Sequence, residues 1–466
     1  MNTPARRRLT LAGSITGASI VALDGTVLTV ARPAMQHDLN ASFTAVQWTS
    51  TAYLIAVASL LVFAGRLGDR YGHQRVFAVG VLGFAAASAG IGLAPGIGWV
   101  IGLRVAQGVA GALLQPATLG MLRAAYPADR LAMPIALRTS AIGLAAAAGP
   151  VVGGALTAQL GWRAVFFLTV LPAVAAGLAA LAVRIPQPPT DRSVGALRAL
   201  DLPGAALLAA ALVCLVHTLV GVPEHGRPAA TVFGLLAAAL LGTAFVHQQR
   251  RAAHPLLPPR VFASPTVASS LGVLLTASAA LFGTLFLATY FLQDVLGLDP
   301  FQSGVRALPL AVTMVAAAPA AAVLMRRHGA RATAGAGMLL LTLGTLLAAR
   351  FDESSGAVAI GGSFLLLGSG FGAVMVTATA ALVRDASVAD AGVAGGLQQT
   401  VMNIGPALGT AAATTLTAGR PLVTAMGPAL LVLAATAAVG VLLATRLPTR
   451  ARARAAGVVE ATRPGH

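Results

Sequence analysis

The sequence contains very little charge for its length. Only 10% of its 466 residues are charged, whereas about a quarter are charged in ordinary soluble proteins. The single cysteine, Cys214, excludes an intrachain disulfide and a cysteine-based metal site. The chain also lacks a nucleotide-binding loop, a zinc-ligand spacing and a nucleophile motif. We therefore expect no enzyme, with no catalytic residues, no metal and no other cofactor.

Apolar residues make up 57% of the chain and occur in recurring runs. Each run is roughly 20 residues long, which is enough for a helix to cross the roughly 30 Å of hydrocarbon in a bilayer. About fourteen such runs follow one another, from residues 9–31 to residues 422–445. The first run is too long for a signal peptide and contains Asp24, so we expect an uncleaved first helix. The pattern predicts an all-α integral membrane protein.

Arginine provides all 31 basic residues, and its distribution predicts the orientation in the membrane. Most of the arginines, including Arg138, are assigned to loops on the N-terminal side, and only Arg104 is assigned to the interior of a span. The positive-inside rule then places both termini in the cytoplasm of a multi-pass protein of the cell inner membrane. The same distribution explains the net charge of +17 without a nucleic-acid partner.

Matching segments at nearly constant spacing indicate an internal repeat. The loop that ends at Gly72 matches the segment that ends at Gly329, and the Gly-Pro motif at Gly149 matches the one at Gly405. Parallel repeats of this kind suit a transporter whose substrate site lies between the two halves. The predicted domains are a six-helix bundle at 1–190, two inserted helices at 191–262, a second six-helix bundle at 263–446 and a basic cytoplasmic tail at 447–466.

Asp24 is a carboxylate deep inside a long apolar segment, where a charge is costly and usually functional. Arg104 lies at a similar depth below the outer end of the fourth span. A carboxylate and a guanidinium at matched depth predict an ion pair that exchanges a proton or a cationic ligand. The alternative is a static bridge that fixes helix packing. Buried ion pairs stabilise less than apolar packing, which favours the functional interpretation.

A loop between the second and third spans concentrates glycine and charge. Asp69 in this loop is suited to cap a helix N-terminus or to pair with Arg70 or Arg75. The loop therefore predicts a gate that breaks and reforms, and the alternative is a solvated loop. The predicted gating residues are Gly65, Gly68, Asp69, Arg70, Gly72 and Arg75.

The fifth span contains a cluster of glycine and proline. Small residues let helices approach closely, and Pro150 frees a backbone carbonyl and permits bending. Plain helix packing is an equal alternative from composition alone. The predicted motif consists of Gly143, Gly149, Pro150, Gly153 and Gly154.

Polar and aromatic residues inside the spans predict a substrate cavity, since aromatic rings bind flat cations. The predicted lining is Gln47, Trp48, Tyr53, Gln107, Gln115, Gln398, Gln399 and Asn403. An interfacial or packing role is the alternative for the two aromatic residues, and interhelical hydrogen bonds are the alternative for the amides. His217 is interpreted as a packing residue rather than a proton carrier.

Four motifs in order resemble those of the major facilitator superfamily, specifically its fourteen-helix drug:proton antiporter family. The motifs are Leu23-Asp24-Gly25-Thr26-Val27, the loop from Gly65 to Arg75, Arg104-Val105-Ala106-Gln107-Gly108 and Gly149-Pro150-Val151-Val152-Gly153-Gly154. The resemblance covers nearly the whole chain. It implies that Asp24 takes part in proton or cation binding, that Arg104 serves the proton relay, and that Asp69 helps to gate the cytoplasmic side. It also implies export.

The expected function is therefore that of a proton-coupled multidrug or small-molecule efflux antiporter that works by alternating access. Its partners would be protons, an amphipathic small molecule and the lipid bilayer, and we expect a monomer. One alternative is a proton-coupled importer or facilitator of a metabolite on the same fold. A second is a membrane sensor that binds a ligand without moving it.

Overall fold

The structure is a computed structural model that describes residues 4–182, 201–225, 228–252, 255–257, 264–298, 300–387, 390–418 and 420–449. In these ranges the protein is almost entirely helical, with only an isolated bridge between Gly329 and Thr449. The long helices are α1 (Pro4–Asp38), α2 (Phe43–Tyr71), α3 (His73–Gly92), α4 (Ile97–Ala125), α5 (Ala132–Leu160), α6 (Trp162–Ala182), α7 (Leu202–His225), α8 (Pro228–Arg251), α10 (Pro265–Tyr290), α11 (Pro300–His328), α12 (Ala330–Ala348), α13 (Ala357–Asp385), α14 (Ala391–Thr417) and α15 (Leu422–Ala444). The predicted all-α fold is confirmed.

Thirteen helices in the described part of the chain are long and apolar enough to cross a membrane. Helix α14 is also long, with 27 residues, but Gln398, Gln399 and Asn403 lower its hydropathy. The helix count agrees with the roughly fourteen spans expected from the apolar runs. The chain is therefore a multi-pass membrane protein.

Local sequence sets several helix boundaries. Ser42 caps the start of α2 by accepting a hydrogen bond from the amide of Ala45. Gly72 separates α2 from α3 with a φ of 93°, and Gly329 separates α11 from α12 with a φ of 88°. Both values lie in the region that favours glycine. The two glycines are the pair matched by the sequence repeat, so the repeat extends to the backbone geometry of these turns.

By packing, the chain divides into two compact units. Unit 1 comprises Met1–Ala128, Ala141–Val261 and Ala386–Asn403, and unit 2 comprises Asp129–Ser140, Phe262–Asp385 and Ile404–His466. This grouping divides α5 and α14 between the units. It describes packing rather than the sequence repeat, so the predicted domain boundaries stay a prediction. The tail beyond residue 449 and the segment 183–200 lie outside the described residues.

The main core of unit 1 lies among α1, α2, α3, α4 and α6. Phe77, Phe84 and Leu114 are completely buried there. The inserted helices α7 and α8 pack against each other, and α7 packs against α2. A smaller cluster of Val62, Phe245 and Leu256 connects α2, α8 and the segment after α8. The inserted pair is therefore part of unit 1 rather than a separate body.

Asp201 organises the inserted pair at one end. Its carboxylate accepts hydrogen bonds from the amide of Gly204 at 3.1 Å and the amide of Leu256 at 3.3 Å. The side chain of Gln249 at the end of α8 donates to the same carboxylate at 2.5 Å. One buried acid thus caps α7 and holds α8 and the following segment.

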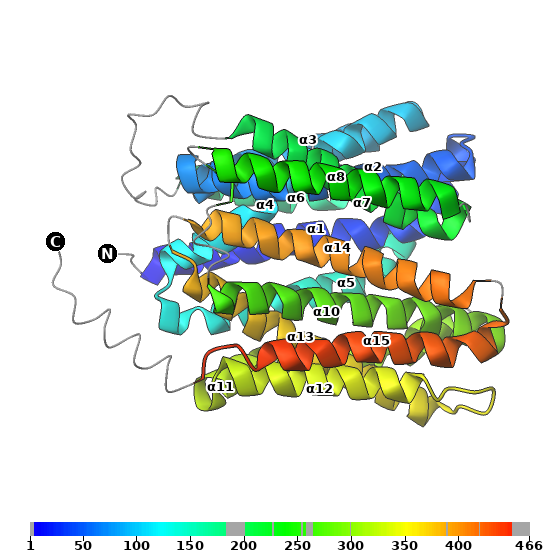
Figure 1. Ribbon diagram of the computed structural model, residues 1–466. Helices are drawn as coiled ribbons and strands as arrows, with labels where there is room; N and C mark the ends of the chain where they lie inside the picture. The colour runs from blue at the N-terminus through cyan, green and yellow to red at the C-terminus, as the bar shows by residue number, and fades with distance from the viewer. Residues whose placement is uncertain are drawn as a thin grey trace. The chain divides into compact units, whose positions relative to one another are not determined.

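Unit 2 contains α10, α11, α12, α13 and α15, which run side by side in Figure 1. The first turns of α5 belong to this unit, where Ser140 donates a hydrogen bond of 2.8 Å to the carbonyl of Val315 on α11. The Gly-Pro motif of α14 approaches α10 closely, because a Cβ at Gly405 would lie only 2.6 Å from the Cβ of Ser278. Glycine is therefore required for this contact.

Candidate functional site

The clearest polar site in unit 1 is the buried ion pair between Asp24 of α1 and Arg104 of α4. The Nη1 atom of Arg104 lies 2.6 Å from Oδ2 of Asp24. Asp24 is 6% exposed and Arg104 only 1% exposed. The two residues are 80 positions apart in the chain, and the structure brings them together as their matched depths predict. Their roles stay a prediction.

Gln107 lies one turn after Arg104 on the same face of α4 and completes the pair. Its Oε1 accepts a hydrogen bond from Nη1 of Arg104 at 2.5 Å, and its Nε2 donates one to Oδ1 of Asp24 at 3.0 Å. Nε2 also donates to the hydroxyl of Ser88 on α3 at 2.7 Å. Both carboxylate oxygens of Asp24 therefore have a hydrogen-bond donor.

The remaining contacts of Arg104 come from α2. Its Nε donates to the backbone carbonyl of Thr49 at 2.9 Å. Its guanidinium carbon lies 4.2 Å from the centre of the Tyr53 ring, which is a cation–π contact. The guanidinium is thus held by a carboxylate, an amide, a carbonyl and an aromatic ring. These contacts compensate the buried charge.

Asp69 at the end of α2 accepts hydrogen bonds from the first amides of α14. The distances are 2.7 Å from Gly392 N and 3.1 Å from Val393 N. Nε2 of His73 lies 3.2 Å from Oδ1 of the same carboxylate. The structure therefore shows the helix cap that was one of the predicted alternatives, with His73 beside the same carboxylate.

The segment predicted as a loop is helical except at Gly72, because α2 runs to Tyr71 and α3 begins at His73. Two glycines near the end of α2 leave no room for a side chain. A Cβ at Gly65 would overlap the backbone of Gly392, and a Cβ at Gly68 would overlap the His73 ring. Nearby, Arg66 lies 3.9 Å from Asp390, which precedes α14. The glycines therefore let α2 and the start of α14 approach closely enough for Asp69 to cap α14.

The glycine motif of α5 packs against α1 just beyond Asp24. A Cβ at Gly153 would lie 2.9 Å from Val27, and one at Gly149 would overlap the side chain of Thr26. Gly154 faces Val30 at an ordinary contact distance of 3.8 Å. A change in α5 at these glycines therefore acts directly on the helix that carries Asp24.

The sequence matches the Major Facilitator Superfamily model over residues 15–410. The chain belongs to the Major Facilitator Superfamily. It is therefore a multi-pass membrane protein built on a transporter fold, and the family resemblance of the four motifs is confirmed.

Relatives in this superfamily include drug-resistance and export proteins. The tetracenomycin C resistance and export protein of Streptomyces glaucescens is 40% identical over 88% of this chain and 76% of the relative. The cephamycin export protein of Amycolatopsis lactamdurans is 34% identical, with coverages of 85% and 82%. The multidrug efflux pump LfrA of Mycolicibacterium smegmatis is 30% identical, with coverages of 88% and 80%.

A solved structure supports the fold independently. The crystal structure of the human organic anion transporter MFSD10 matches with a TM-score of 0.67 over 95% of this chain and all of that chain. The sequence identity is 14%. This likeness shows the fold alone.

Within this superfamily fold, the predicted cavity residues fall into separate groups. Gln107 belongs to the ion-pair network and Tyr53 lies beneath Arg104. Gln115 on α4 accepts a hydrogen bond from Gln399 on α14. The Asn403 side chain bonds to the carbonyl of Gln399 on its own helix. The predicted set is therefore not one continuous cluster in the described contacts.

Other members of the set have different surroundings. Trp48 is 40% exposed and stacks on His217 of α7, with ring centres 5.9 Å apart. His217 thus has a packing contact, as expected. Gln398 is completely buried, and neither polar atom of its side chain has a hydrogen-bond partner in the described part of the chain.

Sequence reasoning missed several members of the site. Ser88 and Thr49 gave no signal, because small polar residues are common inside helices and Thr49 contributes only its carbonyl. His73 lies within the predicted loop from Gly65 to Arg75 and was not selected. Outside this site, Arg138 was assigned to a loop, yet it lies inside α5 and is only 2% exposed. The available signal was its place within the fifth apolar run, residues 134–158.

Proposed function

We propose that this protein exports small amphipathic compounds in exchange for protons by alternating access. Asp24 binds a proton or a cationic substrate in competition, and Arg104 serves as its counter-charge. Inward proton flow then drives efflux. Both termini lie in the cytoplasm, and the transporter works as a monomer.

The network around Asp24 carries this proposal. Both carboxylate oxygens have donors, from Arg104 and from Gln107. A proton that arrives on Asp24 must therefore weaken at least one of these contacts. Because Arg104 also touches α2, the weakened contact releases a constraint between α1, α2 and α4. Protonation and helix movement are thereby linked through one guanidinium.

Two neighbouring features fit a transporter that alternates between states. The cap that Asp69 provides to α14 is the cytoplasmic latch of the proposal, since it breaks when α2 and α14 separate. The glycines of α5 press on α1 next to Thr26 and Val27 and transmit movement to Asp24. Export is favoured over import by the names of the relatives, which include export and efflux proteins.

An importer on the same fold is the second candidate. It shares the ion pair and differs in the direction of accumulation. The sensor alternative predicts ligand binding without any movement of ligand across a bilayer. Purified protein in liposomes separates these three functions.

The test is Asp24→Asn in proteoliposomes with an imposed proton gradient. Asp38→Asn is the matched control, because it makes the same change on α1 at an exposed residue. The probes are tetracenomycin C and a cephamycin, taken from the names of two relatives, together with a cationic dye. Substrate accumulation and proton release are recorded in the same vesicles.

We expect the wild type and Asp38→Asn to transport a probe against its concentration gradient, in the direction of export. We also expect both proteins to release protons when the probe is added. Asp24→Asn should fall to the level of empty liposomes. Undiminished proton-driven export by Asp24→Asn contradicts the proposal. Accumulation in the opposite direction supports the importer, and binding without movement supports the sensor.

A further inference from the structure

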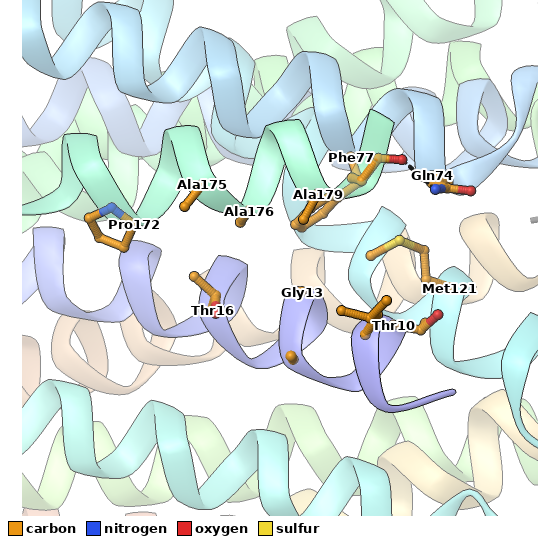
Figure 2. A pocket seen from close by; sticks show the side chains of 13 residues that line it. Thr10, Gly13, Thr16, Gln74, Phe77, Met121, Pro172, Ala175, Ala176 and Ala179 are labelled. Carbon is orange, nitrogen blue, oxygen red and sulfur yellow. Dashed lines mark hydrogen bonds between the residues drawn. The ribbon is translucent and has the colours of Figure 1, made fainter. Parts of the chain in front are cut away.

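A groove of about 280 Å³ lies within unit 1 between α1 and α6. Figure 2 shows Thr10, Gly13 and Thr16 of α1 facing Pro172, Ala175, Ala176 and Ala179 of α6 across it. Phe77 of α3 and Met121 of α4 also line it. The groove is spatially separate from the Asp24 network, because none of the residues that line it belongs to that network.

Small side chains create this space. The walls consist largely of alanine, glycine and threonine. The buried ring of Phe77 and the buried thioether of Met121 lie behind them. Ala12, Ala175 and Ala179 are exposed, so the groove opens sideways from the helices. Around the opening, Leu9 is 48% exposed, Leu178 57% and Leu171 77%. On a membrane-spanning helix such an apolar surface faces lipid.

The amide and the basic side chain lie at one end of the groove, while the other polar lining residues are the threonines Thr10 and Thr16. The side chain of Gln74 lies at that end and donates a hydrogen bond to the carbonyl of Ala180, near the end of α6. Arg6 precedes Leu9 and Thr10 by three and four residues, so it lies on the same face of α1, one turn beyond the groove. The site therefore has an apolar channel with a basic and amide-bearing mouth.

We propose that the groove binds one acyl chain of an anionic phospholipid, with the headgroup phosphate at Arg6 and Gln74. The channel follows α1 for about two turns, from Leu9 to Thr16, which is roughly 10 Å of the bilayer depth. An apolar chain joined to a negative headgroup matches this division of polarity. The lipid packs α1, the helix that carries Asp24, against α6.

The test uses protein reconstituted in vesicles that contain phosphatidylglycerol with a photoreactive group in its acyl chain. Peptides that carry the label are identified by mass spectrometry. Ala179→Phe fills the groove with an aromatic ring. Leu178→Phe is the control, because it adds a ring at the adjacent exposed position, which does not line the groove. Arg6→Gln tests the headgroup contact.

We expect the label on α1 between Leu9 and Thr16 and on α6 between Pro172 and Ala180. Ala179→Phe should lower this labelling about tenfold, while Leu178→Phe leaves it unchanged. Arg6→Gln should lower the preference for phosphatidylglycerol over phosphatidylcholine about fivefold. The readout needs no transport, so its outcome is independent of the export proposal.

Equal labelling of Ala179→Phe and Leu178→Phe overturns the assignment. The assignment also fails if tetracenomycin C displaces the label and excess phosphatidylglycerol does not. In that case the groove binds substrate rather than lipid. Equal labelling by the phosphatidylcholine analogue in the wild type overturns the anionic preference.

Discussion

Arg104 in unit 1 and Arg138 in unit 2 are both buried inside helices, at 1% and 2% exposure. Arg104 contacts the Asp24 carboxylate, a glutamine, a backbone carbonyl and an aromatic ring. Arg138 has no ion pair with any residue that the structure describes, and its Nε has no hydrogen-bond acceptor there. The same residue type is thus buried in two opposite environments.

The difference matters because a buried charge without a partner is destabilising, whereas a bonded one is nearly neutral. Arg104 is held in place by its contacts, so removing it leaves Asp24 uncompensated. Arg138 is held by the packing around it. Burial alone therefore does not identify a functional arginine, and the sign of the stability change on removal separates the two cases.

Arg104→Met should cause the largest effect. It leaves the Asp24 carboxylate buried without its cation, which costs about 3–5 kcal/mol of the free energy of unfolding. Chemical unfolding of the purified protein in detergent measures this loss. Asp24→Asn combined with Arg104→Met should recover part of it. A double variant that is no more stable than Arg104→Met contradicts the pairing. Substrate-evoked proton release should be lost in both variants.

Arg138→Met should act in the opposite direction. It removes an unpaired buried cation and keeps the apolar volume, so we expect a gain of about 1–3 kcal/mol in the same measurement. Arg138→Lys should bring no such gain, since it keeps the charge. A loss of stability in Arg138→Met would mean that Arg138 has a partner, and the contrast with Arg104 would disappear.

Asp69→Ala tests an acid that caps the start of a helix. It removes the cap of α14 and should cost about 1 kcal/mol. Asp69→Asn keeps an oxygen that accepts from the amides of Gly392 and Val393, so it should cost less. Equal losses in the two variants would show that the charge, rather than the cap, is what stabilises this contact.

Asp38 is an exposed acid that pairs with an arginine, in contrast to the buried Asp24, and its substitution should have the smallest effect on stability. Hydrogen bonds from the Trp162 indole, and then from Arg163, hold the pKa of Asp38 below its ordinary value. Because the pKa in the folded state is the lower one, this contact stabilises the protein above about pH 4 and is lost as the pH falls below it.

Thermal unfolding of Asp38→Asn should therefore differ slightly from the wild type at neutral pH, and the two curves should merge in acid. A difference that persists at low pH contradicts a carboxylate contact. The effect should also shrink in high salt, unlike the effect of Arg104→Met, because exposed charges are screened and buried charges are not.

Much of the fold and part of the site follow from sequence. The apolar runs predict the membrane-spanning helices, and the repeat locates the turns at Gly72 and Gly329. Depth matching predicts the contact between Asp24 and Arg104. The capping role of Asp69 was one of two alternatives, and only the structure selects it.

Hydrophobic patterning determined by itself that this chain is a helical membrane protein and roughly how deep each residue lies, because the length of an apolar run fixes its position along the bilayer normal. The motifs identified the family. Only the tertiary structure decided which groups meet: Asp69 with Gly392, 323 residues away, and Arg104 with the Thr49 carbonyl. The physical reason is that depth leaves the rotation of each helix and its neighbours undetermined. Side-chain packing settles both, and with them whether a buried arginine finds an acid.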